Sequence, residues 1–386
     1  MIAFKISAPG RIILSGEYAE IYGKNVLMTT LNRRTTLQFA ELINNSRIFS
    51  IEFPDVGIAL TLPLYLVENI ISNNDFIYLN RVHLFEYVQY FINSNNMWST
   101  CEQKFTLQMF FFLLLYIAHE EGLVVKPFRV HLTTELPMNA GLGRSTSFAT
   151  CLAACFLHWS RLQKGDHNKF SRQELRLISM YAMYCKKNVE DSMCLIDSAV
   201  CLFGNRVTRF QYCGKYDCSR AYHTSYIDLP EMRILLVDLK IRQNKDEQIE
   251  QVARQKHFCP KFDTILNEMD KISKYIFKLL RLIAINYTNN NLSQLEVAFK
   301  IIKGFIQLNQ KMLSDLNLSN PSLTTICSIV NDYGCTGKLT GTGENRFAYI
   351  LLRPGISEEE IGNISAHLES NFPVTVTSIS CDGIRI

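Results

Sequence analysis

The sequence predicts an α+β fold built from two lobes, and three observations lead to this prediction. At 386 residues the chain is long enough for two domains of ordinary size. Strand-like runs and helical periodicity share the chain without an internal repeat. A polar, irregular stretch at 213–226 interrupts the pattern. We therefore expect one lobe over residues 1–225 and a second over residues 226–386.

The composition favours a globular protein without a nucleic-acid or membrane partner. Hydrophobic residues make up 47% of the chain and charged residues 20%, and the net charge is only +4. This balance predicts neither a nucleic-acid-binding nor a membrane-binding surface. No signal peptide is apparent, and the most apolar run, Met109–Ala118, is about half as long as a membrane span.

The cysteines and histidines do not predict a disulfide framework or a metal cluster. Twelve cysteines are scattered without a C-x-x-C pair, and no histidine spacing suits a metal. Several cysteines have apolar or small neighbours, which is typical of reduced thiols in a cytoplasmic protein. These are Cys151, Cys155, Cys194 and Cys201.

Strands dominate the predicted start of the first lobe, and helices follow. Pro9-Gly10 predicts a turn between the first two strands. The expected strands are Ile2–Ala8, Ile12–Leu14, Val26–Thr30, Thr35–Phe39, 128–134 and Leu202–Tyr212. The expected helices are 104–121, 145–162 and 172–188.

The second lobe is predicted to be mostly helical between a few strands. Its expected strands are Arg233–Leu239, 346–352 and 373–380. Its expected helices are 246–256, 261–287, 290–315, 321–333 and 357–371.

The most informative stretch is residues 135–148, ELPMNAGLGRSTSF, where a strand leads through a glycine-bearing turn into a small-residue helix. Glycines let the backbone approach an anion, and the N–H groups of a first helical turn point towards it. Gly141, Gly143 and Ser145 stand where amides and a hydroxyl would meet phosphates and a metal. The stretch is neither a Walker loop nor a dinucleotide fingerprint.

Three other segments carry charges or glycines in unusual surroundings. Arg11 and Glu17 lie beside apolar residues in SAPGRIILSGEYA. Arg11 could bind a phosphate or a carboxylate. The alternative is a strand edge whose charges face the solvent. Asp197 lies among apolar and small residues, so it is a candidate proton acceptor, or else a helix cap. Residues 338–343, KLTGTG, form a second glycine-bearing turn, for which a hairpin connection is the alternative.

Taken in order, these four pieces resemble the superfamily of galactokinase, homoserine kinase, mevalonate kinase and phosphomevalonate kinase, and mevalonate kinases most closely. Residues 7–27, SAPGRIILSGEYAEIYGKNVL, are similar to the first motif of that family. Residues 135–148 are similar to its phosphate loop, and residues 338–352, KLTGTGENRFAYILL, to its third motif. The resemblance covers essentially the whole chain and identifies it as a divergent member.

The resemblance implies a fold and a reaction. It implies an N-terminal lobe of ribosomal-protein-S5-like type, a C-terminal ferredoxin-like lobe, and an active site in the cleft between them. ATP and Mg²⁺ are the implied cofactors, and transfer of the γ-phosphoryl group to the C5 hydroxyl of mevalonate is the implied reaction. A homodimer is also implied.

The same resemblance assigns roles to individual residues. Asp197 would receive or orient the hydroxyl proton, Arg11 would stabilise negative charge, and Ser145 would bind Mg²⁺. The ATP-binding residues would be Asn139, Ala140, Gly141, Leu142, Gly143, Arg144 and Ser145. The substrate would lie between Arg11, Glu17, Tyr18 and Asp197.

Several positions depart from the family pattern. Arg11 replaces a lysine, as it does in galactokinases, and Tyr18 replaces a histidine. The family's metal-binding glutamate falls at Lys186, which cannot bind Mg²⁺. Glu190 or Asp191 is the candidate replacement. The third motif has Glu344-Asn345-Arg346 in place of glycines.

These departures leave two alternatives to an active mevalonate kinase. One is a catalytically silent relative that binds a ligand. The other is a kinase of a different small alcohol, such as phosphomevalonate, which would need a basic pocket of the kind that Lys240, Arg242 and Lys245 would supply. A galactokinase is not favoured, because the His-Thr-Asp-Tyr continuation is missing after Glu17.

Overall fold

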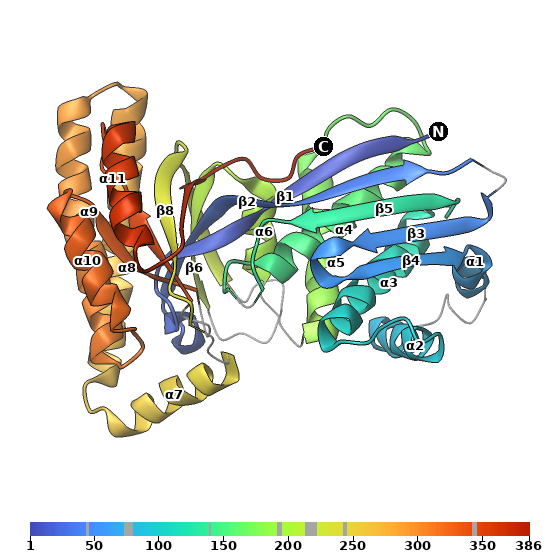
Figure 1. Cartoon of the computed structure of the whole chain (residues 1–386), viewed down its shortest axis with the longest axis horizontal. Coiled ribbons are helices and arrows are strands. Elements are labelled where there is room, and N and C mark those ends of the chain that lie inside the picture. Colours follow the sequence, from blue (N-terminus) through green and yellow to red (C-terminus); the bar gives the residue numbers. More distant parts are fainter. Residues whose placement is uncertain are drawn as a thin grey trace.

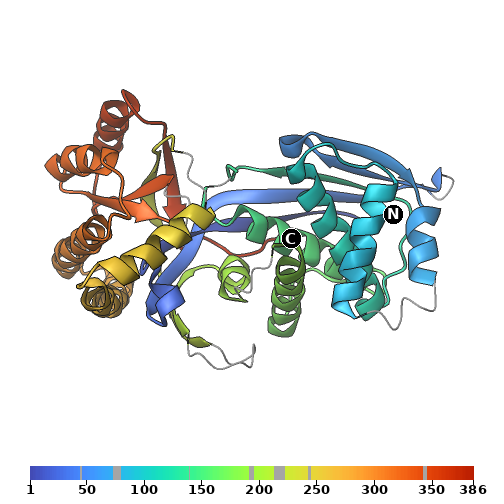
Figure 2. The same cartoon turned by 90° about the horizontal axis from the view of Figure 1, so that it is seen from below.

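A computed structural model describes residues 1–43, 46–72, 80–138, 140–190, 195–212, 222–241, 245–341 and 346–386. One mixed sheet runs through the molecule, with a group of helices at each end (Figure 1). Two long strands, β1 (Ala3–Ser15) and β2 (Asn25–Glu41), extend across the middle and connect the two halves (Figures 1 and 2). The mixed α+β architecture with two lobes confirms the predicted fold class.

The sheet has a simple order around β2. In the first half the order is β4-β3-β5-β2, where only the β3–β5 pair is parallel. The second half continues from β2 as β11-β8-β10-β9, and β1 and β6 also pair with β2. The remaining strands are β3 (Ile48–Phe53), β4 (Ile58–Pro63), β5 (Phe128–Thr134), β6 (Arg206–Tyr212), β7 (Tyr222–Asp228), β8 (Met232–Asp238), β9 (Thr336–Thr340), β10 (Phe347–Leu351) and β11 (Val374–Ile379).

The predicted turn at Pro9-Gly10 was wrong. The dipeptide lies inside the continuous strand β1, where the pairing with β2 shifts register between Pro9 and Gly10. Such a bulge accommodates proline, because the residue there need not donate a ladder hydrogen bond. The four predicted N-terminal strands are therefore two long strands, and each extends from one half of the molecule into the other.

Six helices are described in the first half. Helix α3 begins at a capping box between Thr100 and Gln103, and it ends at Gly122, which is in the left-handed region. The helices are α1 (Tyr65–Ser72), α2 (Arg81–Ser94), α3 (Cys101–Glu121), α4 (Arg144–Leu162), α5 (Arg172–Glu190) and α6 (Leu195–Phe203). The predictions for α3, α4, α5 and β5 are confirmed, whereas α6 was missed.

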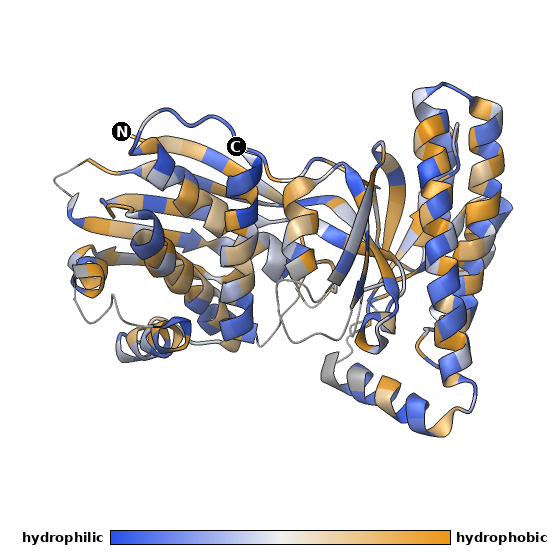
Figure 3. Cartoon of the chain, turned by 180° about the vertical axis from the view of Figure 1, so that it is seen from behind, coloured by the Kyte–Doolittle hydropathy of each residue, from blue (hydrophilic) through white to orange (hydrophobic). Residues whose placement is uncertain are grey.

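In the second half, β8 separates two hydrophobic cores. Ile234 and Leu236 belong to one core, and Leu235 and Val237 to the other, as the alternation of a strand requires. Helices α8 and α9 cover one face with amphipathic surfaces (Figure 3). The helices are α7 (Lys245–Phe258), α8 (Phe262–Thr288), α9 (Leu292–Asp315), α10 (Ser322–Asp332) and α11 (Glu358–Glu369). The helices predicted for this half are confirmed.

The C-terminal segment returns to the first half. The backbones of Ser7 and Arg385 exchange two hydrogen bonds of 2.9 Å. The expected boundary between residues 225 and 226 falls inside β7, and the division at that point stays a prediction. No helix in the described part of the chain is long and apolar enough to cross a membrane.

Candidate active site

The glycine-bearing loop joins β5 to the first turn of α4. Gly141 and Gly143 have φ angles of 65° and 79°, which favour glycine. A Cβ atom at Gly143 would lie 2.6 Å from Cγ of Arg11, so the backbone here is close to a charged side chain. No side chain in the described ranges caps α4 at Gly143. The start of this helix is therefore suited to an anion.

The first and third motifs flank this loop. The backbone N–H of Arg11 donates to the carbonyl of Leu142 at 2.9 Å. The Thr340 hydroxyl accepts from the N–H of Ile13 at 3.1 Å and donates to its carbonyl at 2.9 Å. A Cβ atom at Gly341 would lie 3.3 Å from Gly141. The tertiary structure thus brings three distant segments together, while residues 342–345 lie outside the described ranges.

Arg11 and Asp197 form a two-pronged ion pair. Nη2 of Arg11 donates to Oδ2 of Asp197 at 2.9 Å, and Nε lies 2.8 Å from Oδ1. Nη1 of Arg11 also donates to the carbonyl of Gly141 at 3.2 Å. The side chains are only 12% and 5% exposed. The first turn of α6 therefore places the Asp197 carboxylate directly beside the phosphate loop.

A cavity of about 590 Å³ opens along these residues. Its polar end contains Arg11, Gly141, Ser145, Lys186 and Asp197. The rest of its lining combines apolar residues with charged and polar ones: Phe53, Val56, Phe105, Met109 and Phe148 are apolar, and Asp55, Glu102, Thr106 and Arg144 are not. A cavity of this size with apolar walls and a cluster of polar groups suits a nucleotide. Phe148 ends the 135–148 motif, but sequence reasoning missed the other apolar residues, because they come from β3, the turn after it and α3 and share no motif.

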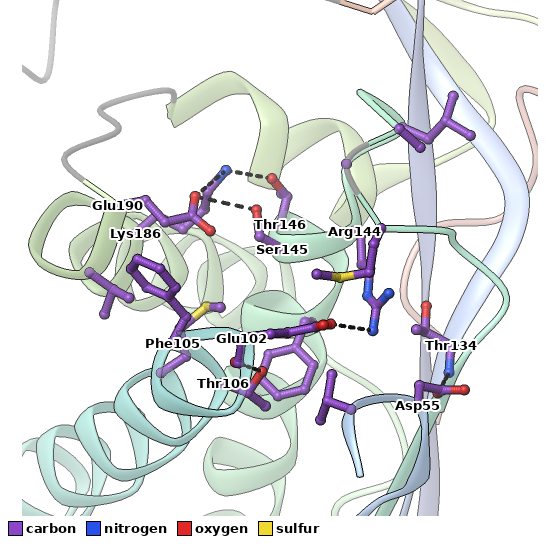
Figure 4. Close-up of a pocket in the computed structure, with 18 of the residues that line it drawn as sticks. Asp55, Glu102, Phe105, Thr106, Thr134, Arg144, Ser145, Thr146, Lys186 and Glu190 are labelled. Carbon is purple, nitrogen blue, oxygen red and sulfur yellow. Dashed lines mark hydrogen bonds and ion pairs between the residues drawn. The ribbon is translucent and has the colours of Figure 1, made fainter. Parts of the chain in front are cut away.

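Lys186 reaches the polar end from α5 (Figure 4). Its Nζ donates to Oγ1 of Thr146 at 2.7 Å. The same nitrogen lies 3.8 Å from Oε2 of Glu190 and 3.9 Å from Oδ2 of Asp197. The Ser145 hydroxyl donates to Oε2 of Glu190 at 3.3 Å. The departure from the family pattern thus lies inside the cavity.

Arg144 extends from the loop towards α3. Its Nη2 lies 3.3 Å from Oε1 of Glu102, and both residues line the cavity (Figure 4). Burial lowers the pKa of Arg144, and the nearby Glu102 partly offsets this effect. The side chain therefore extends from the loop to α3 along the wall of the cavity.

Glu17 and Tyr18 lie elsewhere. Glu17 pairs with Lys338, and their side chains are 1% and 0% exposed. Burial raises the pKa of Glu17 and lowers that of Lys338, while each charge partly offsets the shift of the other. Tyr18 is 2% exposed and belongs to the core that contains Leu235 and Val237. Neither is among the described residues that line the cavity, so their substrate contacts stay predictions. Asn139 lies outside the described residues.

The oxygen atoms of Ser145 and Glu190 fit a hard cation that arrives with phosphates. Mg²⁺ in kinases is held by one or two protein oxygens together with substrate phosphates. A hydroxyl and a carboxylate lie side by side here. Within the described ranges no group of three or more acidic, histidine or cysteine side chains could hold a metal alone. The remaining ligands would come from the nucleotide.

Comparisons with known proteins find kinases. A model of the GHMP kinases N terminal domain matches residues 109–205. Mevalonate kinase from Gibberella zeae is 26% identical over 99% of this chain and 77% of its own length. The human mevalonate kinase is also 26% identical, over 99% of this chain and 94% of its own length.

The fold is also found among solved structures. The Methanococcus jannaschii mevalonate kinase superimposes with a TM-score of 0.66 at 19% identity, over 97% of this chain and 98% of that one. The matched family region contains α4, α5 and α6, which carry Ser145, Lys186 and Asp197. The chain is therefore a small-molecule kinase that contains a match to the GHMP kinases N terminal domain, and it is similar along its whole length to mevalonate kinases.

Proposed function

We propose that this protein transfers the γ-phosphoryl group of ATP to the C5 hydroxyl of mevalonate. The observation that carries the proposal is the ion pair between Arg11 and Asp197, which faces the phosphate loop at the polar end of the cavity. The curated relatives that match the whole chain are mevalonate kinases, which favours this alcohol over others.

The cavity supports a definite orientation for ATP. The purine would pack against apolar lining residues such as Phe105 and Met109, where burial of its faces is favourable. The phosphates would then extend to the loop at 140–145 and the first turn of α4. The γ-phosphoryl group would lie nearest Arg11 and Asp197, where the alcohol must also bind.

Asp197 and Arg11 would divide the chemistry between them. The C5 oxygen forms a bond to the γ-phosphorus while the bond from that phosphorus to the ADP oxygen breaks. The hydroxyl proton passes to a carboxylate oxygen of Asp197. Arg11 is permanently charged, so it stabilises the negative charge on the transferring group without exchanging protons. Positioning and electrostatics account for most of the catalysis in such a transfer.

Mg²⁺ would be held by Ser145 and Glu190 together with the nucleotide phosphates, and it would neutralise part of their charge. The Ser145 hydroxyl would then offer its oxygen to the cation instead of donating to Glu190. Glu190 is offered here as the oxygen ligand in place of the glutamate that the family has at position 186.

The proposal is tested by ADP release from purified protein with ATP, Mg²⁺ and mevalonate. Steady turnover is expected, and in Asp197→Asn it should fall by about 10²–10⁴-fold while ATP affinity measured by calorimetry stays within about threefold. Galactose and phosphomevalonate serve as control alcohols. Turnover in Asp197→Asn close to that of the unsubstituted protein would refute the assignment of the base. ATP binding without turnover of any alcohol would indicate a catalytically silent relative.

A further inference from the structure

Lys186 is a buried cation at the position where the family pattern expects a metal-binding glutamate. Its residue is only 5% exposed, yet it lines the cavity beside Ser145 and Asp197. Burying a lysine is costly unless its charge is used. The replacement of a metal-binding carboxylate by an ammonium reverses the charge on this wall of the site. Two carboxylates and a hydroxyl compensate this charge, and the side chain still lines the cavity.

The contacts of Lys186 leave capacity for a ligand. An ammonium group has three hydrogen-bond donors. Thr146 accepts one of them at 2.7 Å. The carboxylates of Glu190 and Asp197, at 3.8 and 3.9 Å, are close enough for charge attraction but too far for hydrogen bonds. Among the described residues, only Thr146 accepts a hydrogen bond from this nitrogen.

We propose that Lys186 binds the γ-phosphate of the nucleotide directly, and so provides a fixed positive charge where relatives rely on a carboxylate-bound metal. The inference rests on the proposed function for the orientation of ATP. Because Nζ lies 3.9 Å from Oδ2 of Asp197, the phosphate that meets Lys186 is the one next to the proton acceptor. That phosphate is the group to be transferred. Arg11 contacts the same carboxylate through its guanidinium, so the two cations flank the site of transfer.

Direct binding of the phosphate by Lys186 would make ATP affinity less dependent on Mg²⁺. A protein that binds phosphates with its own ammonium retains affinity for ATP when no metal is present. Charge-assisted hydrogen bonds contribute more than neutral ones, because one partner carries a full charge. We therefore expect ATP affinity in excess EDTA to depend on Lys186. AMP, which lacks the β- and γ-phosphates, should bind independently of it.

The experiment is isothermal titration of ATP, ADP and AMP into the full-length protein in excess EDTA. In Lys186→Met the Kd for ATP should rise about tenfold to one-hundredfold, which corresponds to one lost charge-assisted hydrogen bond. The Kd values for ADP and AMP should change less than about threefold. Lys186→Arg should recover most of the ATP affinity, because it keeps the charge. Lys187→Met removes an exposed lysine from the same helix and is the matched control, with no expected effect.

Several outcomes would overturn the proposal. Equal weakening of ATP, ADP and AMP would show that Lys186 only supports the shape of the site. Unchanged ATP affinity in Lys186→Met, or no ATP binding to the unsubstituted protein, would also reject it. If Lys186→Met does not fold, Lys186→Gln replaces it, since glutamine keeps hydrogen-bond donors without the charge. Failure of the proposed function is separate: absent mevalonate turnover with a γ-phosphate-specific loss in Lys186→Met would leave the present inference intact.

Discussion

Two ion pairs that begin in the same strand and its following turn have opposite surroundings. Arg11 and Glu17 are six residues apart in the first motif, and each pairs with a residue far along the chain. The Arg11–Asp197 pair lines the cavity beside the phosphate loop. The side chains of the Glu17–Lys338 pair are 0–1% exposed, and neither is among the described residues that line the cavity. A charge among apolar neighbours can therefore serve chemistry or hold two segments together, and only its surroundings decide which.

Loss of one partner should affect stability in one pair and activity in the other. Removing one partner of a fully buried pair leaves a charge without compensation in a medium of low dielectric. Removing one partner at a cavity wall exposes the other to water, so stability changes less. Removing a partner of the Arg11–Asp197 pair is expected to slow the reaction instead. Substitutions in the two pairs should therefore separate into effects on turnover and effects on unfolding.

The largest contrast is expected between two matched carboxylate-to-amide substitutions. Asp197→Asn should lower kcat by about 10²–10⁴-fold, as expected for loss of a general base. Glu17→Gln should leave the kcat and KM of the folded protein within about threefold, while its unfolding midpoint in urea falls clearly. Steady-state kinetics and urea unfolding of both variants check this. A KM for mevalonate raised tenfold or more in Glu17→Gln would instead support the predicted substrate contact.

The second prediction concerns only the buried ion pair between Glu17 and Lys338. Lys338→Met should lower the free energy of unfolding by about 3–5 kcal/mol, because Glu17 is left as a buried charge without a partner. The double variant Glu17→Gln/Lys338→Met should be less destabilised than the single one, since no charge remains. Urea unfolding of the three variants measures the coupling. Strictly additive losses would contradict a buried ion pair.

The third prediction concerns the guanidinium at the cavity. Arg11→Ala should lower kcat by about 10²–10³-fold, which is the usual effect of losing one charge-stabilising donor. Arg11→Lys should be milder, because a cation remains at this position. Kinetics at saturating ATP and mevalonate test both variants. A loss in Arg11→Lys as severe as in Arg11→Ala would show that the two-pronged geometry, and not the charge, is required.

The smallest expected effect concerns a buried group away from both pairs. Burial, together with the neighbouring His167, lowers the pKa of His158 to about 4. The unfolded chain binds a proton near pH 6.5 and the folded one does not, so stability is full above that pH and is lost as the pH falls towards 4. The free energy of unfolding should therefore drop by about 2 kcal/mol between pH 7.5 and pH 5 from this group.

Urea unfolding at the two pH values measures this drop. His158→Gln should reduce the pH-dependent part by that amount, whereas His223→Gln, at an exposed position, should not. The relative kcat at each pH should be the same in both variants, since neither residue lines the cavity within the described ranges. An unchanged pH dependence in His158→Gln would reject the low pKa.

Local signals were sufficient for the elements that frame the site. The apolar strand before Gly141 and the small-residue helix after Gly143 were predicted to within one residue, because periodicity and glycine punctuation are local properties. The long helices of the second half were also predicted, since their apolar faces repeat over many turns. The error at Pro9-Gly10 has a clear cause. A bulge depends on the partner strand, which the dipeptide alone does not reveal.

The pairing and burial of the charged residues could be learned only from the tertiary structure. The sequence by itself determined that Arg11, Ser145 and Asp197 were candidates, because residue type and spacing carry that information. It did not determine that Glu17 would form a buried ion pair with Lys338, or that Lys186 would line the cavity. Burial and pairing depend on elements more than a hundred residues apart, such as β1 and β9, whose packing removes water from one pair and leaves the other at a cavity wall. Desolvation is a property of the folded surroundings, and so the role of each charge was decided only by the tertiary structure.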